Sequence, residues 1–343
     1  MKFGLVFGAQ SYEHEVSIIS AIAVKNALKG WDLEFVFCDK NRKFYRIEDK
    51  NMRAAYFKQG GYAKAKGLSI GAGGFFESGM FSKSMLEVGT YINLIHGCDG
   101  EDGKMAALFE FFGIPYIGPR IEASVLSYNK ILTKHLAAIA NVKTLPYEIV
   151  NRTSLPNFNF PIIVKPAHLG SSIGISIAKN ESEFSYALDQ AFELDDSAIV
   201  EPYWENVKEF NLAGAKIDGK IVFSNIEEPK KDGYLNFDRK YLDFSRSGAI
   251  EPARPGALLE GKMKDAFARL YNAGSFDGAL IRCDFFEKEG EIYLNEINPN
   301  PGSLANYLFD DFSEVLAALA SSLPPMRQIP VSYELITKIT ANK

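Results

Sequence analysis

The sequence predicts an α/β N-terminal domain with a parallel sheet, followed by two α+β sections. Three observations support this prediction: the length of the chain, the alternation of strand and helix patterns in its first third, and the short, closely spaced strands that follow. With 343 residues, the chain is expected to form two or three domains, because a domain usually holds about 100–200 residues. A content of 47% hydrophobic and 24% charged residues is typical of folded proteins and excludes disordered and fibrous classes.

The first section, residues 1–118, alternates between apolar runs of strand length and apolar residues at helical spacing. The expected strands are residues 3–7, 33–38 and 91–95, and the expected helices run from Val16 to Ala27 and over 104–112. A glycine-rich loop at 96–103 separates the third strand from the second helix. In open α/β sheets such loops lie at the carboxyl edge, where ligands bind, although a simple connector is the alternative. Residues 40–90 give no clear pattern.

The second section, residues 119–201, begins with a helical pattern and continues with short strands. We expect a helix over 121–140 and strands at 162–165, 173–178 and 198–201. The connection between the first two strands is too short to hold a crossover helix, so these strands are expected to pair antiparallel.

The third section, residues 202–343, again mixes strands with one helix. We expect strands at 211–215, 220–224, 279–287 and 291–298 and a helix over 260–273. Its polar, turn-rich segment 227–247 alternates charged and aromatic side chains, a pattern found in lids that order over a substrate. The alternative is a solvated loop.

Composition also limits the partners and the compartment. The net charge is −5, from 38 basic and 43 acidic residues, so nucleic-acid binding by phosphate neutralisation is not expected. Apolar runs are far shorter than the roughly 18–20 residues that span a membrane. The three cysteines have no metal-like or redox spacing, which predicts reduced thiols in the cytoplasm and no zinc.

Two pairs of residues on consecutive strands predict a metal site. Arg282 and Asp284 share one face of their strand, as do Glu296 and Asn298, because side chains two apart on a strand point the same way. The two pairs lie on one face of the hairpin if it has a three-residue loop or a bulge, whereas a two-residue turn at 289–290 would separate them. If the pairs converge, their carboxylate and amide oxygens suit Mg²⁺. The alternative is a half-exposed hairpin with its charges in water.

A lysine followed by a glycine-rich hairpin predicts a phosphate site. Lys165 ends an apolar strand, and the loop to the returning strand contains glycines and the hydroxyls of Ser171 and Ser172. The backbone N–H groups and hydroxyls of such a loop can cover phosphate oxygens, and the lysine adds a point charge. The pattern alone is weak, because most glycine-rich hairpins only turn the chain, and no P-loop sequence occurs.

Four glutamates are further candidates. Glu13 and Glu15 follow the first strand, where the helix dipole alone favours a carboxylate in the opening turn. Glu201 and Glu209 flank the end of a strand, where one carboxylate could accept from an adenine amino group and the other from ribose hydroxyls. Without other motifs, both would pass as surface glutamates.

Six motifs in a fixed order combine these features. They are E-H-E-V-S at 13–17, H-G-C-D-G-E-D-G at 96–103, V-K-P-A-H-L-G-S-S-I-G at 164–174, R-K-Y at 239–241, R-C-D at 282–284 and N-E-I-N-P-N-P-G at 295–302. In these motifs the chain closely resembles the D-alanine–D-alanine ligases of the ATP-grasp superfamily. The resemblance covers residues 3 to about 319, with a poor match over 40–90 and after residue 324.

The resemblance implies that two α+β subdomains, at 119–201 and 202–343, grip ATP with two Mg²⁺ or Mn²⁺ ions. It implies the ligation of two D-alanines through an acyl phosphate, for peptidoglycan precursors, by a homodimer. The implied nucleotide and metal contacts are Lys130 and Lys165 on the α- and β-phosphates, Lys240 on the γ-phosphate, Ser172 on the nucleotide, Glu201 on adenine, Glu209 on ribose, and Asp284, Glu296 and Asn298 on the metal ions.

The resemblance also implies amino-acid contacts. Glu15 would bind the ammonium of the first D-alanine within a hydrogen-bonded set with Ser171 and Tyr241, and His96 would lie nearby. The remaining implied contacts are Arg282 and the backbone near Gly302 on the oxyanion, and Tyr307 and Leu308 beside the second D-alanine.

Three residues depart from the family pattern. Tyr307 stands where a serine is usual, Asn129 where aspartate is common, and Pro202 where many relatives have lysine. Relatives that make D-alanyl-D-lactate depart from tyrosine at the position of Tyr241, so the resemblance implies an amine acceptor. Because Tyr307 lies on the acceptor side, a ligase for another carboxylate and amine, or for D-lactate, is the alternative function. A nucleotide-binding regulatory module without turnover is a third hypothesis, which the full residue set disfavours.

Overall fold

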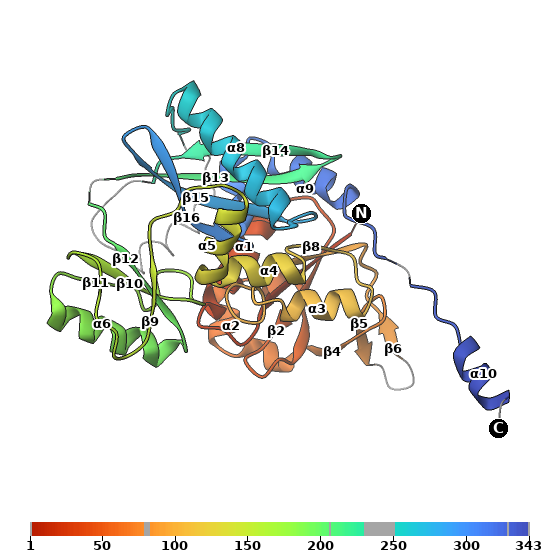
Figure 1. Ribbon diagram of the computed structural model, residues 1–343. Coiled ribbons are helices and arrows are strands. Elements are labelled where there is room, and N and C mark those ends of the chain that lie inside the picture. Colours follow the sequence, from red (N-terminus) through yellow and green to blue (C-terminus); the bar gives the residue numbers. More distant parts are fainter. Residues whose placement is uncertain (1, 79–82, 206, 230–250, 328, 342–343) are drawn as a thin grey trace.

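The computed structural model describes residues 2–78, 83–205, 207–229, 251–327 and 329–341. Three sheets organise these residues, and Figure 1 shows the second sheet on the opposite side of the molecule from β4 to β6 of the first. The expected lid at 227–247 lies mostly outside the described residues, as do Lys240 and Tyr241.

The first sheet has eight strands in the order β6-β5-β4-β3-β2-β1-β7-β8. They are β1 (Phe3–Gly8), β2 (Leu33–Cys38), β3 (Phe44–Ile47), β4 (Lys66–Gly71), β5 (Gly74–Ser78), β6 (Lys83–Met85), β7 (Thr90–Asn93) and β8 (Tyr116–Ile117). β1, β2, β7 and β8 pair in parallel, as predicted. The strands from β3 to β6 pair antiparallel, so the sheet is mixed, and its antiparallel half falls within residues 40–90, where the sequence shows no clear pattern.

Both faces of β1 are buried, which explains its continuous apolar sequence. Phe3, Leu5 and Phe7 belong to one core cluster and Val6 to another. The helical elements of this part are α1 (His14–Ala27), η1 (Asp49–Asn51), α2 (Ala54–Lys58), η2 (Gly61–Lys64) and α3 (Lys104–Phe111).

The second sheet has the order β11-β10-β12-β9 and is antiparallel throughout, as expected for β10 and β11. Its elements are β9 (Glu148–Val150), β10 (Ile162–Pro166), β11 (Ser176–Ala178), α6 (Glu181–Leu194) and β12 (Ala198–Pro202). Apolar residues of α6, including Phe184 and Leu188, pack on the strand residues Ile162 and Val200.

The third sheet, in the order β14-β13-β15-β16, carries helices that come from both sides in sequence. Its strands are β13 (Lys208–Ile217), β14 (Lys220–Glu227), β15 (Leu280–Lys288) and β16 (Glu291–Asn298), and its helices are α4 (Ile121–Tyr128), α5 (Lys130–Ile139) and α8 (Ala257–Ala273). Ala123 of α4 and Leu136 of α5 share a core cluster with Phe267 of α8. The domain limits expected at 118 and 201 remain a prediction.

The helix expected over 121–140 is in fact two helices, α4 and α5, separated at Asn129. The Asn129 side-chain oxygen accepts hydrogen bonds from the N–H groups of Ile131 (2.8 Å) and Leu132 (3.4 Å). Asparagine is a strong N-cap because its side chain satisfies N–H groups that lack partners in the first turn. The periodic apolar pattern continues across this cap, so periodicity alone could not find the break.

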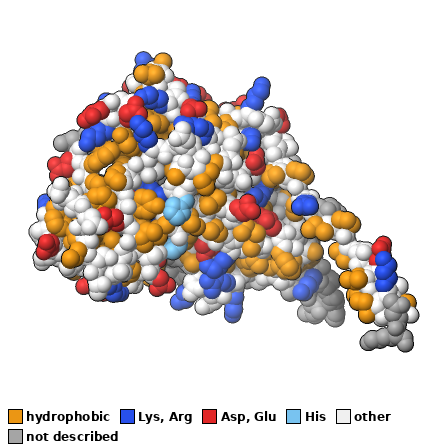
Figure 2. All heavy atoms as spheres, in the orientation of Figure 1, with side chains coloured by type: hydrophobic (Ala, Val, Ile, Leu, Met, Phe, Trp, Pro, Cys, Tyr) orange, Lys and Arg blue, Asp and Glu red, His pale blue; other side chains and the backbone are white. Residues whose placement is uncertain are grey.

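The chain then returns to the first sheet. Leu304 and Leu308 of η3 (Gly302–Leu308) and Leu316 of α9 (Phe312–Ser321) pack in the core cluster of β1. The last helix, α10 (Glu334–Ala341), projects from the body with exposed apolar and charged side chains, as Figures 1 and 2 show. Among the described residues, no helix combines the length and apolarity that a membrane crossing requires.

Candidate active site

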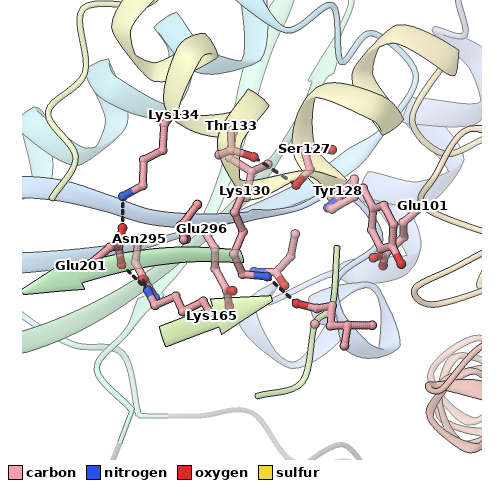
Figure 3. Close-up of a pocket in the computed structure, with 16 residues that line it drawn as sticks. Glu101, Ser127, Tyr128, Lys130, Thr133, Lys134, Lys165, Glu201, Asn295 and Glu296 are labelled. Atoms are coloured by element: carbon pink, nitrogen blue, oxygen red, sulfur yellow. Dashed lines mark hydrogen bonds and ion pairs between the residues drawn. The ribbon is translucent and has the colours of Figure 1, made fainter. Parts of the chain in front are cut away.

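A small cavity of about 40 Å³ lies where the three sheets meet (Figure 3). Its walls come from the loop after β7, the α4–α5 junction, β10, β12 and the end of β16. This volume holds a few water molecules and is far too small for a nucleotide.

Three charged side chains form a buried ion cluster in this cavity. Lys165 Nζ lies 2.6 Å from one Glu201 carboxylate oxygen, and Lys134 is paired with the other, so the two lysines reach Glu201 from two sides in Figure 3. Burial acts to raise the pKa of Glu201, but the two lysines outweigh it and lower the pKa. Two ammonium groups with one ionised carboxylate leave an excess positive charge, which suits an anion.

Glu201 was expected to contact adenine. In the structure both of its carboxylate oxygens are engaged by lysines, and the adenine contact stays a prediction. Lys134 is a site residue that the sequence analysis missed. The sequence could have indicated Lys134, because it lies four residues after Lys130 and residues four apart lie on the same face of a helix.

Lys130 is the first residue of α5 and contacts the glycine-rich hairpin directly. Its Nζ donates to the carbonyl oxygen of Leu169, and burial lowers its pKa. In the same hairpin, Ser171 and Ser172 have φ values of 54° and 61°, a left-handed conformation that is costly for residues with a side chain. Lys130 and Lys165 thus line one cavity, as the phosphate-site hypothesis requires.

The β15–β16 hairpin brings Arg282, Asp284, Glu296 and Asn298 together. Asp284 lies opposite Glu296 and Arg282 opposite Asn298, with a register shift between Asp284 and Phe285. The turn has two residues, because Lys288 pairs with Glu291. The register shift therefore makes a bulge at Asn295, and this bulge restores the common face that a two-residue turn alone would have lost.

Asp284 is buried, and Arg282, Glu296 and Asn298 are partly buried, so these charges do not lie in open water as the alternative of a solvated hairpin requires. The side chains of Arg282 and Asp284 are 12% and 3% exposed. Asp284 accepts from Arg282 Nε (2.6 Å) and Nη2 (2.7 Å) and from Asn298 Nδ2 (3.0 Å). Burial raises the pKa of Asp284 to about 7, the Arg282 guanidinium opposes this, and the negative Glu296 adds to it.

These residues fit a divalent cation. Two opposed carboxylates and an amide offer the hard oxygen ligands that Mg²⁺ prefers. Burial and the neighbouring Glu296 carboxylate raise the pKa of Asp284. A bound cation would oppose this shift, because its positive charge favours the ionised carboxylate.

The carboxylate next to the glycine-rich hairpin is Glu13, not Glu15. The Ser171 hydroxyl donates to Glu13 Oε1, and Glu13 is 6% exposed. Glu15 lies on the exposed side of α1, so the expected set of Glu15 with Ser171 is wrong. Burial raises the pKa of Glu13 to about 7, and the neighbouring Glu101 raises it further while Ser171 opposes the shift.

His96 and Glu101 lie beside this carboxylate. His96 Nε2 is 2.8 Å from Ser20 Oγ, and Nδ1 is 3.5 Å from Glu101 Oε1. Burial lowers the pKa of His96 and raises that of Glu101 to about 8. Glu101 is a second residue that the sequence analysis left out, although the glycine-rich motif at 96–103 contains it.

The loop after β16 closes this side of the site. Ser303, Leu304 and Ala305 have φ values of 52°, 51° and 49°, an uncommon left-handed run without glycine. The Ser303 N–H donates to Ser20 Oγ at 3.1 Å, which ties the loop to α1. Burial raises the pKa of Tyr307 to about 12, and the nearby Arg282 guanidinium opposes this.

The remaining expected residues lie around this centre. Glu209 is on β13 opposite Phe286 of β15 and contributes to the negative potential at Asp284. Gly302 and Leu308 are buried in η3.

A lysine-rich cavity between two antiparallel sheets, beside a pair of opposed carboxylates, defines an ATP-grasp enzyme. The family described as D-ala D-ala ligase N-terminus matches residues 2–119, and the one described as D-ala D-ala ligase C-terminus matches residues 136–315. The chain belongs to the D-alanine–D-alanine ligase family.

Individual relatives agree. The D-alanine–D-alanine ligase of Campylobacter concisus is 56% identical over 343 residues, which cover 100% of this chain and 99% of that protein. The crystal structure of the Helicobacter pylori enzyme has 48% identity and a TM-score of 0.85, covering 94% of this chain and 99% of that one. The VanG D-Ala:D-Ser ligase of Enterococcus faecalis shares the fold, with 23% identity and a TM-score of 0.75 over 94% of this chain and 97% of that one.

Proposed function

We propose that this protein joins two molecules of D-alanine into D-alanyl-D-alanine, with ATP and a divalent cation, for peptidoglycan precursors in the cytoplasm. The observation that carries the proposal is the convergence of Lys130, Lys165, Asp284 and Glu296, from four separate elements, at one buried centre. The names of relatives that match the whole chain at about half identity or more support the substrate.

The first step needs an activated carboxylate, because a free carboxylate is a poor electrophile. The first D-alanine attacks the γ-phosphate of ATP and becomes an acyl phosphate, while Lys130 and Lys165 hold the other phosphates by charge. Asp284, Glu296 and Asn298 would hold two Mg²⁺ or Mn²⁺ ions, which when bound neutralise the phosphate charge. Ser172 in the hairpin would donate to the nucleotide.

In the second step the amine of the other D-alanine attacks the acyl carbon and loses a proton, and inorganic phosphate leaves as the peptide bond forms. Arg282 and the backbone near Gly302 are placed to stabilise the oxyanion that forms. Glu13 takes the role first expected of Glu15, which is to bind the ammonium of the first D-alanine. Exclusion of water protects the acyl phosphate from hydrolysis, and the hairpin that carries Ser171 covers the site for this purpose.

We also propose a homodimer. Exposed apolar side chains gather on α3 and α4: Phe111 is 84% exposed, and Leu108, Ile121 and Val125 are 37–41% exposed. Adjacent apolar residues of this size on two neighbouring helices suit a protein–protein contact.

An ADP-release assay tests the substrate. We expect turnover with ATP, Mg²⁺ and D-alanine alone, and none with L-alanine. No turnover with D-alanine would contradict the proposal, and ADP release only with D-serine or D-lactate as second substrate would favour the alternative ligase. Arg282→Ala should abolish turnover, whereas Arg152→Ala, which removes an arginine whose side chain is 53% exposed, should leave it unchanged.

A further inference from the structure

A histidine in the glycine-rich hairpin is held by an aspartate from another element. Both the His168 N–H (2.6 Å) and the His168 ring atom Nδ1 (2.9 Å) meet the Asp195 carboxylate, which follows α6. The hydrogen bonds from His168 lower the pKa of Asp195 against the opposite effect of its burial. An ionised carboxylate can only accept hydrogen bonds, so Nδ1 carries the proton of the imidazole.

The other ring nitrogen meets the N-cap of α5. His168 Nε2 lies 2.9 Å from Asn129 Nδ2. The Asn129 carbonyl oxygen is already occupied, because it accepts from the N–H groups of Ile131 and Leu132. The capping bonds therefore fix the amide with its NH₂ group towards the ring, and this NH₂ group can only donate.

These two contacts define one protonation state. With Nδ1 donating to Asp195, Nε2 must be unprotonated to accept from Asn129. If Nε2 were protonated, its N–H would face the NH₂ group of Asn129, and two donors would oppose each other. A carboxylate at position 129 could instead accept a hydrogen bond from the protonated ring. Among the described residues, Asp195 contacts the ring, Tyr128 at the end of α4 has its ring centroid 5.8 Å from that of His168, and Lys130 on α5 interacts electrostatically with Asp195.

The contact joins the two parts that carry the phosphate-binding groups. The hairpin holds Ser171, and α5 begins with Lys130, whose backbone N–H donates to Ala167 O at 2.9 Å and whose ammonium donates to Leu169 O. The His168–Asn129 bond joins two side chains across this contact, in addition to the Lys130–Leu169 bond, and the imidazole side chain is 38% exposed, so solvent protons can reach it.

We propose that neutral His168 is a positioning residue that holds the glycine-rich hairpin against the start of α5 for nucleotide binding, and that its protonation weakens this hold. The proposal rests on the proposed use of ATP at this site. It predicts that the dependence of nucleotide affinity on pH changes when His168 is replaced by a residue that cannot be protonated.

Two substitutions of His168 separate its contacts. His168→Asn keeps a donor near Asp195 but removes the acceptor that Asn129 requires. His168→Gln places an amide oxygen near the position of Nε2 and cannot be protonated in this pH range. His135→Asn is the control, because His135 is an exposed histidine on α5, the helix that Asn129 caps.

The measurement is the Kd for a non-hydrolysable ATP analogue with Mg²⁺, by calorimetry at about pH 8 and pH 5.5, which bracket the range where histidines titrate. We expect His168→Asn to weaken binding roughly three- to tenfold at pH 8, the effect of one lost hydrogen bond, and to add little further loss at pH 5.5. His168→Gln should bind like the unmodified protein at pH 8 and lose less at pH 5.5, while His135→Asn should match the unmodified protein at both pH values.

An unchanged Kd for His168→Asn at pH 8, or a full acid loss retained in His168→Gln, would overturn the proposal. Thermal melting of each variant shows whether a change in Kd reflects unfolding. The Kd is measured without D-alanine, so a failure to ligate D-alanine would refute the proposed function and leave this test valid.

Discussion

Glu13 and Glu15 stand two positions apart at the start of α1, and the phase of the helix gives them opposite surroundings. Glu13 is buried against the hairpin residue Ser171, and Glu15 faces solvent. The motif contains both carboxylates, and its sequence does not say which one turns inward. Only the position of the helix against a hairpin 158 residues away decides this, so sequence reasoning chose the motif correctly and the residue wrongly.

This pair gives a matched test at the residue scale. We expect Glu13→Gln to raise the KM for the first D-alanine at least tenfold, because an ammonium loses its buried carboxylate partner, while the KM for ATP changes much less. Glu15→Gln should change neither value. Steady-state kinetics of both variants measure these KM values. A raised KM for D-alanine in Glu15→Gln and an unchanged one in Glu13→Gln would show that Glu15 binds the ammonium.

Other site residues were predictable from their own chemistry. Strand alternation, a short-range rule, places Arg282 with Asp284 and Glu296 with Asn298 on their own strands, but it does not place one pair relative to the other. Lys134 and Glu101 could not be assigned a role in this way, since Lys134 pairs with Glu201 and Glu101 acts on Glu13, both of which lie in other parts of the chain.

Among the elements, the β15–β16 hairpin shows how two local features determine the site. The Glu289–Gly290 turn has positive φ at both residues, 55° and 76°, which fits the type I′ turn that joins twisted strands. The bulge at Asn295 then shifts the register by one residue, and the Asn295 side chain accepts from Lys165 Nζ at 3.2 Å. Turn signals are readable from sequence, but a bulge inside a strand leaves little pattern.

If the bulge sets the register at the site, changes in the turn should alter stability and not activity. Glu289→Asn should raise the free energy of unfolding by about 0.5–1 kcal/mol, because asparagine tolerates positive φ. Gly290→Ala should lower it by about 1 kcal/mol, from backbone strain alone, because no heavy atom lies within 4 Å of an added Cβ. Urea unfolding gives both values, and a loss of ligase activity in Glu289→Asn would show that the turn positions the site.

The antiparallel half of the first sheet is the element that sequence reasoning did not find. Its strands β4 and β6 expose many of their residues, so they lack the apolar runs that marked β1, β2 and β7. Pairing with β3 and β5 supplies the stabilisation that their composition does not indicate.

At the scale of the whole molecule, the site exists because distant segments close on each other. Ser303 after β16 donates to Ser20 of α1, and Asn300 donates to the carbonyl oxygen of Ile95 after β7 at 3.1 Å. This closure buries the carboxyl groups of Glu13 and Glu101. Burial of these carboxyl groups makes their ionised forms unfavourable in the folded protein. A substrate ammonium beside them would stabilise the ionised form.

That cost predicts a dependence of stability on pH in the ligand-free protein. Burial raises the folded-state pKa of Glu13 to about 7 and that of Glu101 to about 8, from 4.5 in the ordinary state. Between these values the folded protein holds protons that the unfolded chain has released, so the free energy of unfolding falls as pH rises through this window. Each group contributes a slope of up to about 1.4 kcal/mol per pH unit.

Urea unfolding at a series of pH values from about 5 to 8.5 measures this slope, which Glu101→Gln should make shallower because one of the two groups no longer titrates. Glu15→Gln, which removes an exposed carboxylate, is the matched control and should keep the slope of the unmodified protein. D-Alanine should stabilise the protein more at pH 8 than at pH 5.5, since its ammonium needs an ionised Glu13. An unchanged slope in Glu101→Gln would mean that Glu101 is ionised in the folded state, and its raised pKa would have to be abandoned.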